Sequence, residues 1–92
     1  MKLTELNPRW VIEQKEFEPR MGMGISFDCP HCRKQRLGVF FANPIDGHPA
    51  ALRVEKLWQR DGVKFENLTL TPSVDCSAMG CWHGNITNGE VI

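Results

Sequence analysis

The chain has 92 residues, and its eleven lysines and arginines balance eleven aspartates and glutamates, so the formal net charge at pH 7 is zero. This balance excludes an overall electric field that would draw the protein to polyphosphate, an anionic membrane or an acidic substrate. Hydrophobic residues make up 41% of the chain and charged residues 24%, a composition that excludes a disordered tail or a fibre.

The first half of the chain predicts short strands on both sides of a turn that carries two cysteines. Apolar residues separated by charges and prolines allow one strand near residues 10–16. Two glycines indicate a flexible connector over residues 21–24. Polar and apolar residues alternate over residues 25–28, and residues 36–42 form a β-prone run. Two strands should therefore flank the turn Cys29-Pro-His-Cys32.

The second half of the chain also indicates strands and turns. Residues 52–60 predict either a short helix or a strand, and the strand after them should end at Thr71-Pro72. Asn88-Gly89 suits a type I′ turn because both central residues of that turn need positive φ. Residues 83–87 should then pair with residues 90–92. We therefore expect a mainly β fold built from short antiparallel strands and hairpins.

The chain is interpreted as one zinc-binding β domain over residues 1–92, with residues 1–22 as an N-terminal extension. The first residues, Met1-Lys-Leu-Thr-Glu-Leu-Asn-Pro8, lack the apolar segment of a secretion signal. No later run approaches the roughly 18 apolar residues that a membrane span requires. We therefore expect a cytoplasmic protein without a membrane partner. In that reducing compartment, four cysteines indicate metal ligands or catalytic thiols rather than disulfides.

The cysteines and one histidine have the spacing of a zinc site. A Cys-x-x-Cys turn between two strands lets Cys29 and Cys32 supply half of a tetrahedral site. Three further donors, Cys76, Cys81 and His83, lie within eight residues of one another. Two ligand sets remain open, because either His83 or Cys76 can join Cys29, Cys32 and Cys81. Four protein ligands leave zinc no open position, so the ion should be structural.

Redox chemistry is the alternative interpretation of Cys29-Pro-His-Cys32. A thiol–disulfide oxidoreductase would use Cys29 as the low-pKa nucleophile and Cys32 as the resolving thiol, with Thr71-Pro72 as a cis-proline turn beside them. Such an enzyme places its first cysteine at the start of a long helix, whereas this sequence turns β-prone soon after Cys32. The redox interpretation also leaves the second group of donors, residues 76–83, without a role.

Other catalytic patterns are missing from the sequence. Carboxylates are scattered rather than paired, and no serine has the context of a nucleophile elbow, so we expect no enzyme. Basic residues over residues 33–36 lie near Phe40 and Phe41, which is typical either of a small nucleic-acid surface or of a solvated strand end beside core aromatics. We expect the protein to act by binding a protein or a nucleic acid. The sequence leaves its oligomeric state open.

Four motifs in this order resemble a family of small, uncharacterised phage and prophage proteins. The resemblance spans about residues 23–92, and its motifs read Phe27-x-Cys29-Pro-x-Cys32, Leu57-Trp58, Leu68-Thr-Leu-Thr-Pro-Ser73-Val74 and Cys81-x-His83-Gly-x-Ile-x-Asn-Gly89. The resemblance implies a zinc-ribbon-like β fold and carries no established activity. It runs through His83, so it favours Cys29, Cys32, Cys81 and His83 as the zinc ligands. The Cys81-Trp-His83 spacing is narrower than the corresponding Cys and His spacing in many members.

Some members of that family carry the label ammonia monooxygenase. A copper monooxygenase of that type is a membrane enzyme with a histidine-rich copper site. The present chain has three histidines and no run of apolar residues long enough to span a membrane. We therefore interpret the label as a misassignment.

Overall fold

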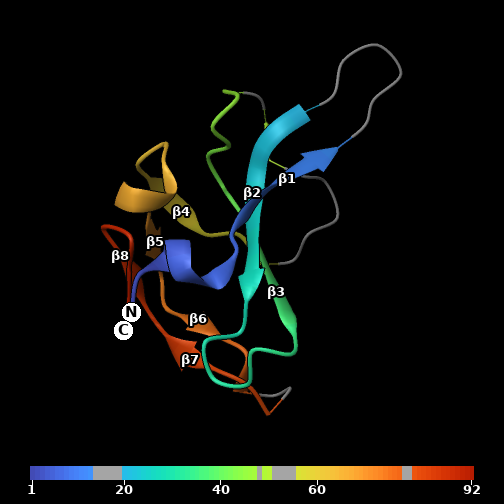
Figure 1. Cartoon of the computed structure of the whole chain (residues 1–92). Coiled ribbons are helices and arrows are strands. Elements are labelled where there is room, and N and C mark those ends of the chain that lie inside the picture. The colour runs from blue at the N-terminus through green and yellow to red at the C-terminus, as the bar shows by residue number, and fades with distance from the viewer. Residues whose placement is uncertain (14–19, 48, 51–55, 78–79) are drawn as a thin grey trace.

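Three antiparallel strands form the largest sheet of the protein (Figure 1). They are β1 (Arg9–Glu13), β2 (Arg20–Asp28) and β3 (Arg36–Phe40), with β2 in the centre. Along β3, Leu37 and Val39 are buried, whereas Arg36 and Gly38 are exposed. This is the period-two pattern of a strand with one face on a core. The computed structural model describes residues 1–13, 20–47, 49–50, 56–77 and 80–92.

Three two-stranded sheets complete the architecture of the described residues. The first pairs β4 (Gln59–Asp61) with β5 (Thr69–Thr71), the second pairs β6 (Val74–Asp75) with β7 (His83–Gly84), and the third pairs β8 (Ile86–Thr87) with β9 (Glu90–Val91). All of these pairs are antiparallel. The predicted fold class, mainly β with short antiparallel strands and hairpins, is confirmed.

The described residues form two single-turn 3₁₀ helices, η1 (Leu3–Leu6) and η2 (Phe65–Asn67). Each is too short for a helix to be stable by itself, so tertiary packing has to hold it in place. Within the described part of the chain, no helix is both long and apolar enough to cross a membrane.

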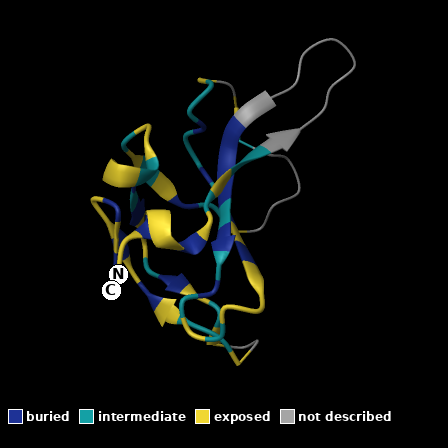
Figure 2. Ribbon diagram, viewed as in Figure 1, coloured by how far each residue is buried: buried dark blue, intermediate teal, exposed yellow. Residues whose placement is uncertain are grey.

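The predicted flexible connector at residues 21–24 is wrong, because these residues lie inside β2. The glycines serve close packing there. A Cβ on Gly24 would lie 2.3 Å from the carbonyl oxygen of Val39, and one on Gly22 would lie 2.7 Å from Cβ of Ile45. Only a residue without a side chain allows these approaches, so the glycines keep the strand tightly packed rather than mobile. In Figure 2 the described part of β2 is buried along most of its length.

The prediction of the C-terminal hairpin is confirmed for its turn, but part of the predicted strand pairing is wrong. Asn88 and Gly89 have φ of 48° and 76°, as a type I′ turn requires. Their hairpin pairs β8 with β9, but His83–Gly84 pairs with Val74–Asp75 instead of continuing that ladder. Pairing with a strand earlier in the chain therefore overrides the local hairpin at residues 83–84.

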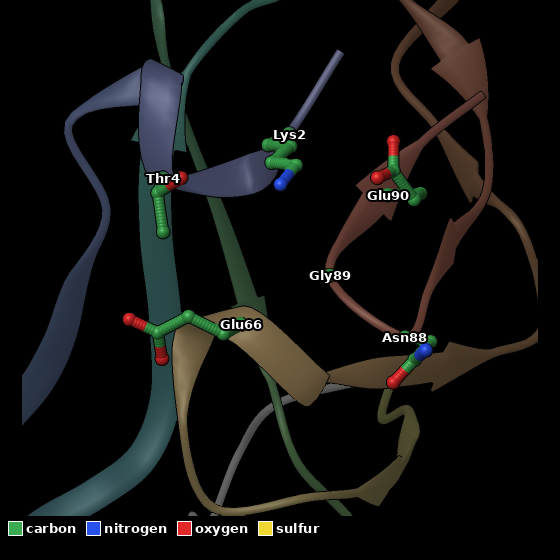
Figure 3. A pocket seen from close by; sticks show the side chains of 6 residues that line it. All are labelled: Lys2, Thr4, Glu66, Asn88, Gly89 and Glu90. Atoms are coloured by element: carbon green, nitrogen blue, oxygen red, sulfur yellow. The ribbon is translucent and has the colours of Figure 1, made fainter.

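The turn at Gly89 is held between the N-terminus and η2. The N–H of Leu3 donates to the carbonyl oxygen of Gly89 at 2.8 Å, and the N–H of Gly89 donates to that of Leu68 at 2.9 Å. Figure 3 shows the hollow beside this turn, which is lined by Lys2, Thr4, Glu66, Asn88, Gly89 and Glu90. The beginning of the chain is thus fastened to the last hairpin through the backbone.

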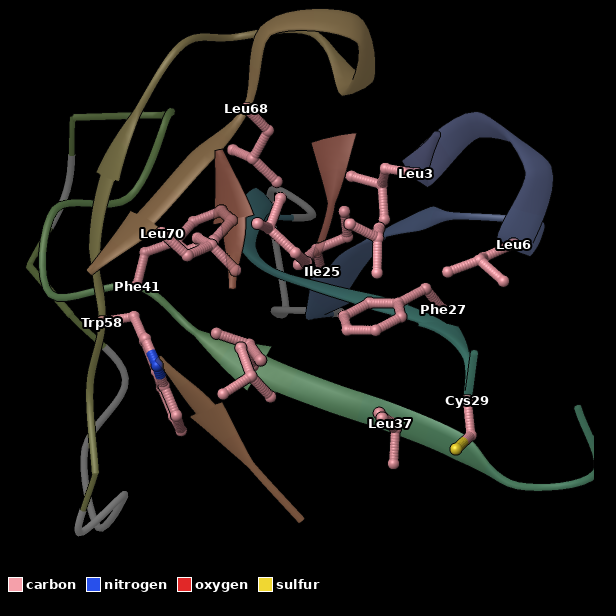
Figure 4. Packing of buried hydrophobic residues seen from close by; sticks show 14 residues of the cluster. Leu3, Leu6, Ile25, Phe27, Cys29, Leu37, Phe41, Trp58, Leu68 and Leu70 are labelled. Atoms are coloured by element: carbon pink, nitrogen blue, oxygen red, sulfur yellow. The ribbon is translucent and has the colours of Figure 1, made fainter. Parts of the chain in front are cut away.

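One hydrophobic cluster joins η1, the three-stranded sheet and the smaller sheets (Figure 4). Leu3 and Leu6 of the N-terminal segment are fully buried in it, beside Phe27 of β2. Cys29 lies at one edge of the same cluster and is 0% exposed. Its members are Leu3, Leu6, Ile25, Phe27, Cys29, Leu37, Val39, Phe41, Trp58, Leu68, Leu70, Val74, Ile86 and Val91.

We predict that Gly89→Ala destabilises the protein more than Gly47→Ala. Both glycines have φ of +76°, so both alanines adopt the unfavourable left-handed conformation at a cost of about 1–2 kcal/mol. A Cβ at Gly89 would also lie 2.4 Å from the carbonyl oxygen of Glu66, whereas one at Gly47 meets no atom within 4 Å. That overlap should add about 1–3 kcal/mol. Urea unfolding followed by tryptophan fluorescence measures both losses, and equal losses would contradict the prediction.

Candidate metal centre

The first cysteine turn links β2 to β3. The N–H of Cys29 donates to the carbonyl oxygen of Gln35 at 2.8 Å, and that of Arg33 donates to the carbonyl oxygen of Cys29 at 2.9 Å. Arg33 adopts a positive φ of 59°, which turns the chain back toward β3. The N–H of Lys34 then points at Sγ of Cys32, 3.5 Å away. A backbone donor at this position stabilises negative charge on the sulfur.

The second cysteine turn links β6 to β7. The N–H of Cys76 donates to the carbonyl oxygen of Trp82 at 2.9 Å, and the N–H of Cys81 donates to that of Cys76 at 3.2 Å. These two bonds bring the backbones of Cys76 and Cys81 together at the base of the turn. Asp75 supports the turn by accepting hydrogen bonds from the N–H and the hydroxyl of Ser77, at 2.9 and 2.6 Å.

The two turns lie side by side at one end of the molecule (Figure 1), where three cysteine sulfurs meet. Sγ of Cys81 lies 3.0 Å from Sγ of Cys29 and 3.7 Å from Sγ of Cys32, and the three sulfurs all lie within 4.8 Å of one another. Tetrahedral zinc with Zn–S bonds of about 2.3 Å separates its sulfurs by about 3.8 Å. The 3.7 Å separation matches this value, whereas the 3.0 Å separation is shorter and would have to widen around an ion. The all-thiol donor set suits a soft or borderline divalent metal.

Protons are divided unequally among these sulfurs. Burial raises the pKa of the Cys29 thiol, but the hydrogen bond from Cys81 and backbone N–H groups of the two turns lower that pKa to about 6. The hydrogen bond to Cys29, followed by burial and the hydrogen bond with Cys32, raises the pKa of Cys81 to about 12. Of this pair, Cys29 is the more readily ionised thiol, and a metal ion would have to displace the proton on Cys81.

The structure brings together three of the predicted ligands, Cys29, Cys32 and Cys81. His83 is exposed, and its Nε2 lies 3.2 Å from the hydroxyl of Ser73. Cys76 is half-buried and packs against the same cluster as Cys29. Burial, followed by the negative charges of Cys29 and Asp75, raises the pKa of Cys76. Neither His83 nor Cys76 belongs to the group of three sulfurs, so the fourth ligand stays a prediction.

Gln35 is a contributor that the sequence motifs did not indicate. Its side-chain oxygen accepts a hydrogen bond from Sγ of Cys81 at 2.9 Å, while its carbonyl oxygen closes the first turn through Cys29. Trp82 adds an edge-to-face contact with Phe27, with ring centroids 6.2 Å apart, and so seats the second turn on the core. The only sequence signal for Gln35 is its position immediately before β3.

The thiol geometry differs from the redox interpretation. Cys29 follows a strand, and the sulfur that donates a hydrogen bond to it belongs to Cys81 of the other turn, 52 residues away. The Thr71–Pro72 peptide bond is cis, as the redox interpretation expected. His31 is exposed in the first turn, and His48 lies outside the described residues. The arrangement thus joins two turns through sulfur instead of presenting one Cys-x-x-Cys pair.

Comparison of the chain with models of protein families, with curated proteins and with solved structures found no match. The chemistry of this site therefore has to be inferred from its own residues. These residues define a cluster of three thiols that is able to hold a metal ion.

We predict that Arg33→Gly preserves the first cysteine turn and that Arg33→Val damages it. Glycine adopts the positive φ of this position freely, whereas a β-branched residue is a conformational outlier there. The free energy of unfolding should change by less than about 0.5 kcal/mol for glycine and fall by about 1–2 kcal/mol for valine.

Lys34→Val is the matched control for this turn. Lys34 is exposed and does not have a positive φ, and its N–H to Cys32 survives the substitution. Urea unfolding should therefore show little loss for Lys34→Val. Similar losses for the two valine variants would show that the backbone at Arg33 imposes no special requirement.

Proposed function

We propose that this protein is a structural zinc-binding module. The observation that carries the proposal is the meeting of three cysteine sulfurs, contributed by two turns that lie 49 to 52 residues apart in the sequence. Thiolate ligands favour zinc among the divalent ions commonly bound by proteins, and zinc takes four such ligands in its structural sites.

The burial of the site supports a structural role for the metal. Cys29 is 0% exposed, and Cys32 and Cys81 are each half-buried against the core. An ion bound by these sulfurs would fasten the turn between β2 and β3 to the turn between β6 and β7. A chain of this size buries only about 60–65% of its unfolded surface, so such a link adds to a core that is marginal by itself.

We infer further that the module acts by binding a partner, in the cytoplasm and without catalysis of its own. The resemblance to small phage and prophage proteins with a zinc-ribbon-like fold supports this interpretation. The partner is a protein or a nucleic acid. Arg36 of the basic cluster is paired with Asp28 at 3.0 Å and donates to Ser26 at 2.7 Å, whereas Arg33 and Lys34 are exposed.

The purified protein should carry about one zinc ion per chain and should unfold when a strong chelator removes it. Structural zinc contributes about 10–16 kcal/mol of apparent binding free energy, which is comparable to or larger than the 5–15 kcal/mol net stability of a typical domain. Native mass spectrometry measures the stoichiometry, and circular dichroism follows the fold.

Adding zinc back to the chelated protein is the control, because it should restore the β spectrum while magnesium should not. Protein that is isolated without metal and keeps the same spectrum in chelator would overturn the structural-zinc proposal.

Thiol–disulfide exchange is the second candidate function, and the lowered pKa of Cys29, about 6, is the observation that favours it. Burial of Cys29 works against this activity, because a nucleophile that is 0% exposed cannot reach a protein disulfide. Zinc bound to its thiolate would block the attack as well.

The zinc-loaded protein should therefore reduce insulin disulfides at the background rate. An insulin-turbidity assay compares the wild type with Cys29→Ser, and both traces should match the buffer control. Rapid turnover that disappears in Cys29→Ser would instead identify Cys29 as a redox nucleophile.

A further inference from the structure

Three thiolates leave one position of a tetrahedral zinc ion without a protein ligand, so the identity of the fourth donor decides the chemistry of the site. Two candidates lie next to Cys81 in the second turn and its strands, namely Cys76 and His83. They lie on different faces of the β6–β7 pair, and the face decides which of them is directed toward the three sulfurs.

The pairing of β6 with β7 directs His83 away from the sulfurs. Val74 is opposite Gly84 and Asp75 is opposite His83 in the register of this pair. Directly opposed residues of an antiparallel pair share one face. Val74 and Gly84 are buried, whereas Asp75 and His83 are exposed, so His83 lies on the outer face.

The side chain of His83 also has a partner on that outer face. Its Nε2 lies 3.2 Å from the hydroxyl of Ser73. Cys81 and His83 are two residues apart, but β7 begins at His83 and Cys81 belongs to the turn, so the alternation of a single strand does not put them on one face.

Cys76 occupies the opposite face. Cys76 comes directly after β6 and packs against the hydrophobic cluster that contains the buried Val74 and Cys29, so it lies on the core side of the pair. The two backbone hydrogen bonds at the base of the turn hold Cys76 next to Cys81. Its sulfur lies outside the group of three, and rotation of a single χ1 angle would redirect it.

We propose that Cys76 is the fourth ligand, so that the protein binds zinc through Cys29, Cys32, Cys76 and Cys81 while His83 stays bonded to Ser73. This assignment rests on the proposed zinc function. Each of the two turns then contributes two thiolates.

Zinc K-edge absorption of the wild-type protein tests the assignment without any substitution. The expected result is a single shell of four sulfurs at about 2.3 Å. A shell of three sulfurs with one nitrogen at about 2.0–2.1 Å would overturn the assignment of Cys76 and leave the zinc function intact. Wild-type protein without zinc would overturn the zinc function itself.

Two matched variants give an independent readout. Cys76→Ser should weaken zinc binding by at least about 100-fold in a chelator competition, because losing a direct ligand should exceed the 10–100-fold effect of losing an outer partner. His83→Ala should retain one zinc per chain with an affinity within about threefold of the wild type. Strong loss of zinc in His83→Ala together with retention in Cys76→Ser would overturn the proposal.

Discussion

The contact on which the rest of this structure depends is the approach of Cys81 to Cys29, whose sulfurs lie 3.0 Å apart. It brings together a turn of the three-stranded sheet and a turn from the last third of the chain. Cys29 belongs to the hydrophobic core as well as to the sulfur cluster, so packing of the core also positions one of the three sulfurs. The cluster is thereby held at a fixed position relative to β2 and β3.

Local signals in the sequence predicted much of this arrangement. Alternating residues after Gly24 and the β-prone run before Phe41 predicted β2 and β3, and Asn88-Gly89 predicted the last turn. The Cys-x-x-Cys motif predicted that Cys29 and Cys32 would share a site, and the structure places both beside Cys81. These signals succeed because the residues that decide each feature are close together in the sequence.

The features that the sequence missed depend on contacts between distant segments. Gly22 and Gly24 were interpreted as flexible, because the backbone of β3 and the side chain of Ile45 that approach them are invisible to a local pattern. The direction of His83 depends on where β7 begins, and that point is set by pairing with β6. Gln35 likewise has no motif of its own, since its contact with Cys81 exists only after both turns have met.

The backbone bonds between the first and last segments affect how the protein can fold during its synthesis. Lys2 bridges to Glu90, and the N–H of Leu3 donates to Gly89, so η1 gains these partners only after almost the whole chain has left the ribosome. The sulfur contact between Cys29 and Cys81 also spans 52 residues. Contacts of such long sequence separation slow folding because loop closure must precede them. The cysteines of the first turn can therefore meet Cys81 only after the segment that carries Cys81 has emerged from the ribosome.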